Sequence, residues 1–144
     1  MKPLVLSVFV SMSVATSAFA RIGDDDKQIE ALYGKPAKVL EETDGARKVG
    51  YTAGGVAVVV DFVNGISRRE GFAKPDTSRL NDEEIKQILN VSAADNTTWK
   101  EVPGKEGDRV WERSDNKARA FLPARGTFFV VQDPSFVQPS DAKQ

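Results

Sequence analysis

The stretch "YTAGGVAVVVDFVNGISRRE", residues 51–70, decides how this chain folds. Two glycines stand before an apolar run, and an Asn-Gly pair follows it. A phosphate-binding loop needs a helix after its glycines, because the helix amides hold the anion. Valines follow here instead, and β-branched residues favour a strand. The stretch therefore predicts a strand at residues 56–63 with a turn on each side, and it excludes a nucleotide-binding loop.

Turn signals and apolar segments recur along the chain and predict further strands. In the first half, strands are expected at residues 37–42, 47–52, 56–63 and 66–72, separated by Asp-Gly, Gly-Gly and Asn-Gly pairs. In the second half they are expected at residues 97–102, 108–113, 117–122 and 127–132. Because Asn-Gly between apolar runs is a strong hairpin signal, neighbouring strands are expected to be antiparallel.

A short predicted helix precedes each set of strands. Residues 29, 32 and 33 are apolar and share one helical face, and Gly34 with Pro36 ends that helix. The acids at 24–26 suit its positive end and lack the ligand spacing of a calcium loop. The second helix begins at Asn81, with Glu84 in the capping-box position, and Asn90 is expected to end it.

The two halves match each other in their caps and turns. A shift of 56 residues superimposes the helices, and a shift of 61 residues superimposes the strands that follow. Helices followed by hairpin-linked strands indicate the α+β class with an antiparallel sheet. The sequence thus predicts one domain over residues 21–132, with both helices on one face of the sheet. The domain is expected to consist of two tandem repeats of one helix and four strands, residues 21–75 and 76–132.

The strand at residues 56–63 leaves open which of its sides the helices cover. Its apolar content favours burial of the side that runs from Val56 to Phe62 in alternate positions. The matching strand at residues 117–122 favours the side that begins with Ala118, since Lys117 and Arg119 are costly to bury. A bulge or a change of register is needed to reconcile the two halves.

The first 20 residues have the three parts of a secretory signal peptide, namely a lysine, a short apolar run and an Ala-Phe-Ala ending. The run is too short to span a bilayer, so we expect cleavage after Ala20 and a periplasmic or secreted protein without a membrane span. No cysteine follows the leader, which argues against a lipid anchor. Residues 133–144, with two prolines and few apolar residues, are expected to form a flexible tail.

The composition limits the possible functions. The chain has no histidine and no cysteine, which excludes the usual catalytic triads and nearly all structural zinc sites. After removal of the leader, 19 basic and 21 acidic side chains remain, so the basic excess of a nucleic-acid-binding protein is missing. We expect no nucleic-acid partner, no cofactor and no metal, and no catalytic motif marks the chain as an enzyme.

Two copies of helix plus four strands, with "ALYGKP" at residues 31–36 closing the first helix, resemble the fold of the β-lactamase inhibitor proteins. The chain is also similar to the SmpA/OmlA family, small lipoproteins of outer-membrane barrel assembly whose helical segment ends in a similar Gly-x-Pro. The resemblance implies an open sheet face that binds a protein, and only the Gly34–Pro36 cap carries over by position. Since cysteines are absent, it implies neither a lipid tether nor inhibition of that particular enzyme.

Aromatic and arginine side chains on the predicted strands form the candidate binding site. The site consists of Tyr51, Trp111, Arg113, Arg119 and Phe121. Such residues are enriched at binding hot spots, and burial of Trp111 in the core is the alternative. The sequence favours a non-enzymatic protein-binding module of the cell envelope. The alternatives are a structural envelope protein, or a small hydrolase or ligand-binding protein that uses carboxylates or arginines in a pocket between helices and sheet.

Overall fold

A computed structural model describes residues 21–137, so the predicted leader and residues 138–144 lie outside the described part. The helices in this part are α1 (Asp26–Tyr33) and α2 (Asp82–Val91). The strands of the first half are β1 (Lys38–Thr43), β2 (Ala46–Ala53), β3 (Val56–Val63) and β4 (Ile66–Ala73). Those of the second half are β5 (Trp99–Pro103), β6 (Arg109–Arg113), β7 (Arg119–Leu122) and β8 (Phe129–Gln132). The predicted α+β class is confirmed, and each strand begins within about two residues of its predicted start.

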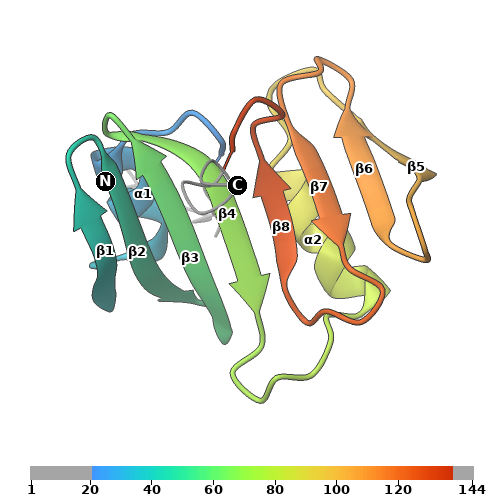
Figure 1. The fold of residues 1–144 in the computed structure, drawn as a ribbon, viewed down its shortest axis with the longest axis horizontal. Helices are drawn as coiled ribbons and strands as arrows, with labels where there is room; N and C mark the ends of the chain where they lie inside the picture. The colour runs from blue at the N-terminus through green and yellow to red at the C-terminus, as the bar shows by residue number, and fades with distance from the viewer. Residues whose placement is uncertain (1–20, 138–144) are drawn as a thin grey trace, which may run out of the picture.

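The strands form one antiparallel sheet of eight strands in the order β1-β2-β3-β4-β8-β7-β6-β5 (Figure 1). The last strands of the two halves, β4 and β8, pair at the centre, from Arg69 opposite Gln132 to Phe72 opposite Phe129. The first strands, β1 and β5, are therefore the edges of the sheet. Figure 1 shows α1 behind the first half and α2 behind the second, so both helices lie on one face and leave the other open.

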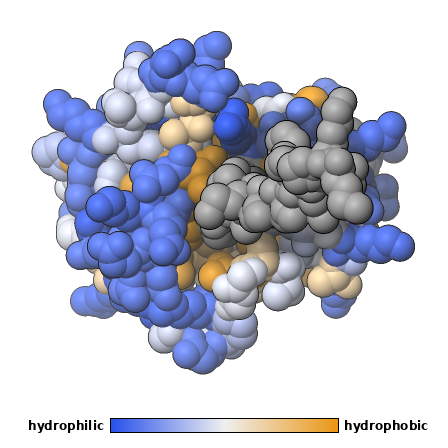
Figure 2. Space-filling model, turned by 180° about the vertical axis from the view of Figure 1, so that it is seen from behind, coloured by the Kyte–Doolittle hydropathy of each residue, from blue (hydrophilic) through white to orange (hydrophobic). Residues whose placement is uncertain are grey.

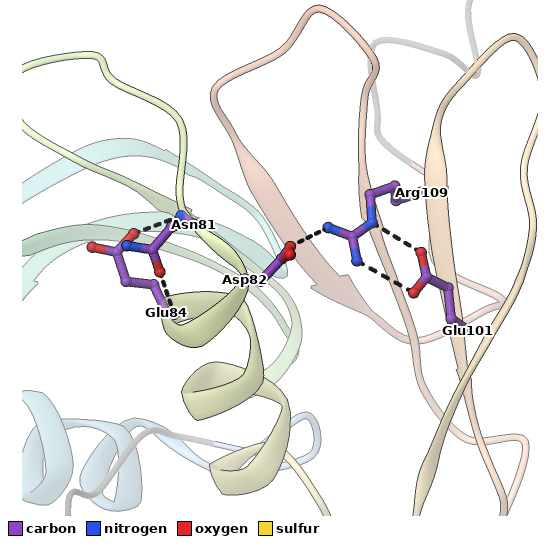
Figure 3. Close-up of polar contacts among 5 residues, drawn as sticks. All are labelled: Asn81, Asp82, Glu84, Glu101 and Arg109. Atoms are coloured by element: carbon purple, nitrogen blue, oxygen red, sulfur yellow. Dashed lines mark hydrogen bonds and ion pairs between the residues drawn. The ribbon is translucent and has the colours of Figure 1, made fainter.

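Both helices begin with a capping box, in which a side chain and the backbone exchange hydrogen bonds at the first turn. Asp25 caps α1 together with Gln28. From the sequence, only an acidic start of this helix was expected, without a capping box. Asn81 caps α2 together with Glu84, as the sequence predicted (Figure 3). These boxes fix where the chain enters each helix.

The two helices end differently. Gly34 closes α1 with a φ of +83°, a conformation that suits glycine, as predicted. The predicted end of α2 at Asn90 was wrong, since the helix continues through Val91 and its C-cap is Ser92. The N–H of Ser92 still donates to the carbonyl of Ile88, and no glycine or proline interrupts the helix before that point.

The helices cover the side of β3 that its apolar content favours. Val58, Val60 and Phe62 are buried in the core, while Val56 at the start of the strand is only partly covered. The turn that follows β3 has positive φ at both central residues, 51° at Asn64 and 76° at the next glycine. This is the conformation that an Asn-Gly hairpin turn requires, so the predicted turn is confirmed.

The hairpin turns show why one shift cannot superimpose the strands of both halves. The turn between β2 and β3 has two residues, the glycine pair at 54–55. In the second half, the N–H of Arg113 donates to the carbonyl of Ala118, and the turn has four residues. The expected shift of 61 residues is therefore wrong for these strands, because it matches the buried Val58 with the exposed Arg119.

One continuous apolar core fills the space between the helices and the sheet. Ile29 of α1 and Ile85 of α2 are 0% and 2% exposed in it. The ring of Phe129, at the centre of the sheet, lies 5.5 Å from that of Trp111 and 6.4 Å from that of Phe72. This core occupies the space in which a pocket between helices and sheet would have to lie.

A carboxyl group is enclosed in the same core. Glu70 of β4 is 1% exposed, and its Oε2 accepts a hydrogen bond of 2.9 Å from the hydroxyl of Tyr33. Its Oε1 is buried without a hydrogen-bond partner. Burial raises the pKa of Glu70 from 4.5 to about 8; the Tyr33 hydrogen bond opposes this rise, and the nearby Asp24 adds to it. Glu70 is therefore uncharged in most molecules at neutral pH.

The start of the expected tail is bonded to the sheet. Residues 133–136 form a turn, and the N–H of Asp133 donates to the carbonyl of Arg68. The Asp133 carboxylate also pairs with the Arg68 guanidinium at 2.9 Å. These contacts link residues 133–136 of the expected tail to the sheet, and its remainder from residue 138 lies outside the described residues.

The outer surface of the helix-covered side is mostly hydrophilic, with hydrophobic residues showing near its middle (Figure 2). In residues 21–137, no helix is long and apolar enough to cross a membrane.

Candidate functional site

The structure places the five residues of the predicted site on two faces of the sheet. Tyr51, Trp111 and Arg113 face the helices and are 3%, 5% and 4% exposed. Arg119 and Phe121 lie on the open face. The five therefore do not form one surface. For the four residues of β6 and β7 the reason is the register of this pair, which places Ala120 opposite Trp111 and Arg119 opposite Glu112, because side chains alternate between the two faces along each strand.

The three helix-facing residues have roles inside the fold. The Tyr51 ring lies 5.6 Å from that of Tyr33, and burial raises the pKa of the Tyr51 hydroxyl. Trp111 packs edge-on against the core, which was the alternative expected from the sequence. Arg113 donates to the carbonyl of Ser92 at 3.0 Å and to the Asp115 carboxylate at 2.8 Å. Arg113 thus ties the end of α2 to the β6–β7 turn.

The open face carries a line of apolar side chains that crosses the sheet. Cross-strand pairing aligns seven consecutive positions from β2 to β5, which are Gly50, Val59, Gly71, Val130, Phe121, Val110 and Val102. The positions on β2 and β4 are glycines, and apolar side chains from outside the line cover both. We call the five side chains of this line, together with the covering Leu40 and Phe128, the apolar row.

The two covering side chains are the most exposed members of the apolar row. A Cβ atom built on Gly71 would lie 2.9 Å from Cε1 of Phe128, so the ring occupies the space that the glycine leaves. A Cβ built on Gly50 would lie 4.0 Å from Cδ1 of Leu40. Phe128 and Leu40 are each 43% exposed, whereas Val130 between the halves is 2% exposed. The row therefore projects toward solvent at two points and is covered at its middle.

A line of charged side chains runs beside the apolar row. Cross-strand pairing aligns one residue from each strand of the sheet, which are Glu41, Lys48, Asp61, Arg69, Gln132, Arg119, Glu112 and Lys100. We call these residues the charged row. Asp61 lies 3.2 Å from Arg69 and 3.8 Å from Lys48, and Glu112 lies 3.8 Å from Arg119. The signs alternate on either side of the uncharged Gln132, so the row has little net charge and a defined order of charges.

The second-half edge of the site is held in place by Arg109 (Figure 3). Its guanidinium donates to Glu101 of β5 at 2.9 and 3.3 Å and to Asp82 of α2 at 2.6 Å. It also lies 4.8 Å from the Trp111 ring centroid, in a cation–π contact. The Arg109 hydrogen bonds lower the pKa of the Glu101 carboxyl. These contacts fix the edge strand β5, which carries the end of the apolar row.

An apolar strip with a charged border has the anatomy of a protein–protein interface, in which a hydrophobic centre is surrounded by a polar rim.

The acidic side chains of the described part do not form a metal site. No group of three or more potential metal-ligating residues occurs in residues 21–137. The acidic run before α1 shows this, because Asp24 accepts from the N–H of Arg21, Asp25 caps the helix and Asp26 pairs with Arg47. One hollow of about 440 Å³ is lined by the start of β4 around Arg68, by the β6–β7 turn and by the turn at residues 133–135.

The sequence contained a signal for this site that the aromatic–arginine pattern missed. A glycine inside a strand often marks a close approach by another group. Gly50 and Gly71 stand inside predicted strands, and in the structure both are covered by side chains of the apolar row. The positions of Leu40 and Phe128 could not be deduced, because they depend on long-range pairing and on a bulge in β1.

No family model matches this chain, and no curated protein matches it. Among solved structures, the chain is similar to an extracellular protein containing an SCP domain from Bacillus anthracis. The TM-score is 0.43 and the sequences are 12% identical, and the similarity covers 100% of this chain and 58% of that chain. The chain therefore spans less than two thirds of that protein, and a similarity at this level carries no argument about function.

Proposed function

We propose that this chain is an exported, non-enzymatic protein-binding module of the cell envelope that binds its partner through the open sheet face. The apolar row is the centre of the interface and the charged row is its border. The observation that carries the proposal is the Phe128 ring, which is 43% exposed above the strand glycine at position 71. Aromatic residues are enriched at protein–protein interfaces, and hot spots cluster near the interface centre.

The partner is a folded protein whose own apolar strip matches the row. The alternating charges of the charged row favour a partner with an opposite order of charges, rather than one of strong net charge. Such a border sets orientation and selectivity more than affinity.

Export to the periplasm or the exterior is supported by the leader at residues 1–20. The resemblance to the β-lactamase inhibitor and SmpA/OmlA families supports the same mode of binding, since it implied helices on one face and a free face opposite. We further propose that the halves are tandem repeats. Each has a capping-box helix followed by four strands, and Ile29 and Ile85 lie in the same core.

A matched pair of substitutions on the edge strand tests the proposal. Leu40 and Val39 are neighbours with nearly equal exposure, 43% and 44%. Leu40 lies over Gly50 on the open face, while Val39 is opposite Val49, which faces the helices. Leu40→Asp therefore adds a charge to the proposed interface, and Val39→Asp adds the same charge outside it.

The measurement is cross-linking of the purified protein, residues 21–144, in envelope extract at low salt, followed by quantitative mass spectrometry. The wild type and Val39→Asp are expected to recover the same protein. Leu40→Asp and Phe128→Asp are expected to lose it, by about thirtyfold for Phe128, since a hot-spot residue is worth about 2 kcal/mol. Recovery of that protein by all four chains, or of nothing above background by the wild type, would refute the proposal.

A further inference from the structure

The segment that follows the predicted leader is bonded to the start of β4 through one buried serine. Ser67 is 0% exposed, and its hydroxyl donates to the carbonyl of Arg21 at 2.9 Å. Its backbone N–H donates to the carbonyl of Asp24 at 2.8 Å, and its carbonyl accepts from the N–H of Gly23 at 2.9 Å. We call Arg21, Gly23, Asp24 and Ser67 the N-terminal clasp. Ser67 thus fixes the first described residues on the sheet.

A carboxylate in the clasp reaches the backbone nitrogen of its first residue. Asp24 Oδ2 accepts from the N–H of Arg21 at 2.8 Å, and the N–H of Asp24 donates back to the carbonyl of Arg21 at 3.0 Å. The Arg21 nitrogen belongs to the peptide bond that follows Ala20, where the leader is expected to be cleaved. The carboxylate therefore lies at the atom that cleavage would change.

We propose that cleavage after Ala20 completes the N-terminal clasp by creating an ion pair between the Arg21 α-ammonium group and the Asp24 carboxylate. In the hydrolysis, water adds to the Ala20 carbonyl carbon, the bond to the Arg21 nitrogen breaks, and that nitrogen gains protons. A neutral amide donor becomes a cation at hydrogen-bond distance from a carboxylate. The bond already has an ionised acceptor, and the cationic donor adds the attraction between two opposite charges at short distance.

This inference rests on the proposed export, because the leader is removed only when the chain is exported. Removal of the leader then changes how firmly the first turn is held. The processed chain holds its first turn on β4 more firmly than the precursor does. Ser67 and its neighbour Arg68 are among the first residues of β4, one of the two central strands. The clasp therefore protects the beginning of β4 from fraying.

The test compares two purified chains that differ only at the amino terminus. One begins with a free amine at Arg21, and the other keeps an acetylated Ala20 before it. The free amine is expected to raise Tm by about 1–4 °C at pH 6.5 and low salt, the range for an exposed ion pair in a domain of this size. The difference is expected to shrink in 1 M salt, because exposed charges are screened.

Substitutions identify the pair that is responsible. Asp24→Asn is expected to remove the difference between the two chains. Asp95→Asn is the control, because Asp95 contacts the Arg21 side chain at 3.8 Å rather than its amine, and it is expected to preserve the difference. Amide hydrogen exchange at Gly23, read by NMR, provides a second measurement and is expected to slow in the free-amine chain.

Equal Tm values and equal exchange rates for the two wild-type chains would overturn the inference, as would a difference that persists in Asp24→Asn. A mass of the exported protein that places cleavage at another bond would overturn it too. None of these results bears on docking, because the clasp is measured without a partner and the docking test uses the open face.

Discussion

Replacing Glu70 by glutamine should stabilise this protein at neutral pH. In the wild type, the acid is buried with one oxygen unpartnered, and its pKa is raised to about 8. A folded molecule therefore keeps its proton up to a pH at which the unfolded chain has long lost it. Because the folded state then binds more protons than the unfolded state, the free energy of unfolding falls as pH rises. Glutamine has nearly the same shape and never ionises, so it avoids this loss.

The size of the effect follows from the two pKa values. Each pH unit between the ordinary value of 4.5 and about 8 lowers the free energy of unfolding by about 1.4 kcal/mol. At pH 7 the accumulated loss is about 3 kcal/mol, a large part of the 5–15 kcal/mol of a typical domain. Above about pH 8 both states are ionised, so this group adds no further loss.

Urea unfolding of the wild type and of Glu70→Gln, at pH values from 5 to 9, measures the effect. The two proteins are expected to converge toward pH 4.5 and to differ by about 3 kcal/mol at pH 7. Tyr33→Phe is a useful companion, because the hydroxyl of Tyr33 favours the ionised acid and its removal should extend the decline to higher pH. A glutamine variant that is less stable than the wild type at pH 7, or that keeps the same slope against pH, would contradict the reasoning.

Three further perturbations follow from single contacts. Asn81→Ala removes the cap of α2 and should cost about 1 kcal/mol in urea unfolding, whereas Asn81→Asp should restore most of it; equal stability of the alanine variant would count against the cap. Gly71→Ala places a methyl group against the Phe128 ring and should cost about 1–3 kcal/mol, with shifted Phe128 resonances in NMR spectra; an unmoved ring would show that the glycine does not position it. Arg113→Met removes the hydrogen bond that keeps the pKa of Asp115 low, so that pKa should rise in an NMR titration. The stability that Asp115 supplies is present at neutral pH and lost in acid, and this acid-dependent loss should be smaller in the variant.

Local signals in the sequence were enough to locate the elements of this fold. The Asn-Gly pair at 64–65 and the capping box at Asn81 act over a few residues, and the structure shows both. The faces of the strands were harder, because one residue of register moves every side chain to the other side of the sheet. The turn after Arg113 has four residues, one more than the predicted strands at 108–113 and 117–122 leave between them, so the expected match between the halves does not hold there.

The candidate site was predictable only in outline. An open face opposite the helices was expected, but three of the five predicted residues face the core instead, and Trp111 is among them. Arg113 looked like a surface residue, yet it is 4% exposed because its charge is matched by Asp115 and the end of α2. Pairing between β4 and β8 brings Phe128 beside Gly71, and no local pattern encodes a contact between residues so far apart.

The pairing of β4 with β8 also has a consequence for how the chain assembles. Every other strand pair in the described part joins strands that follow one another in the sequence. Such short-range hairpins form quickly, whereas joining distant segments is slow. As the chain emerges, β4 has an unpaired edge until β8 arrives, and an unpaired edge invites wrong partners. Val131→Ala, at the central join, should therefore slow refolding in stopped-flow experiments more than Val110→Ala does within the last hairpins, and equal rates would argue for a different order of events.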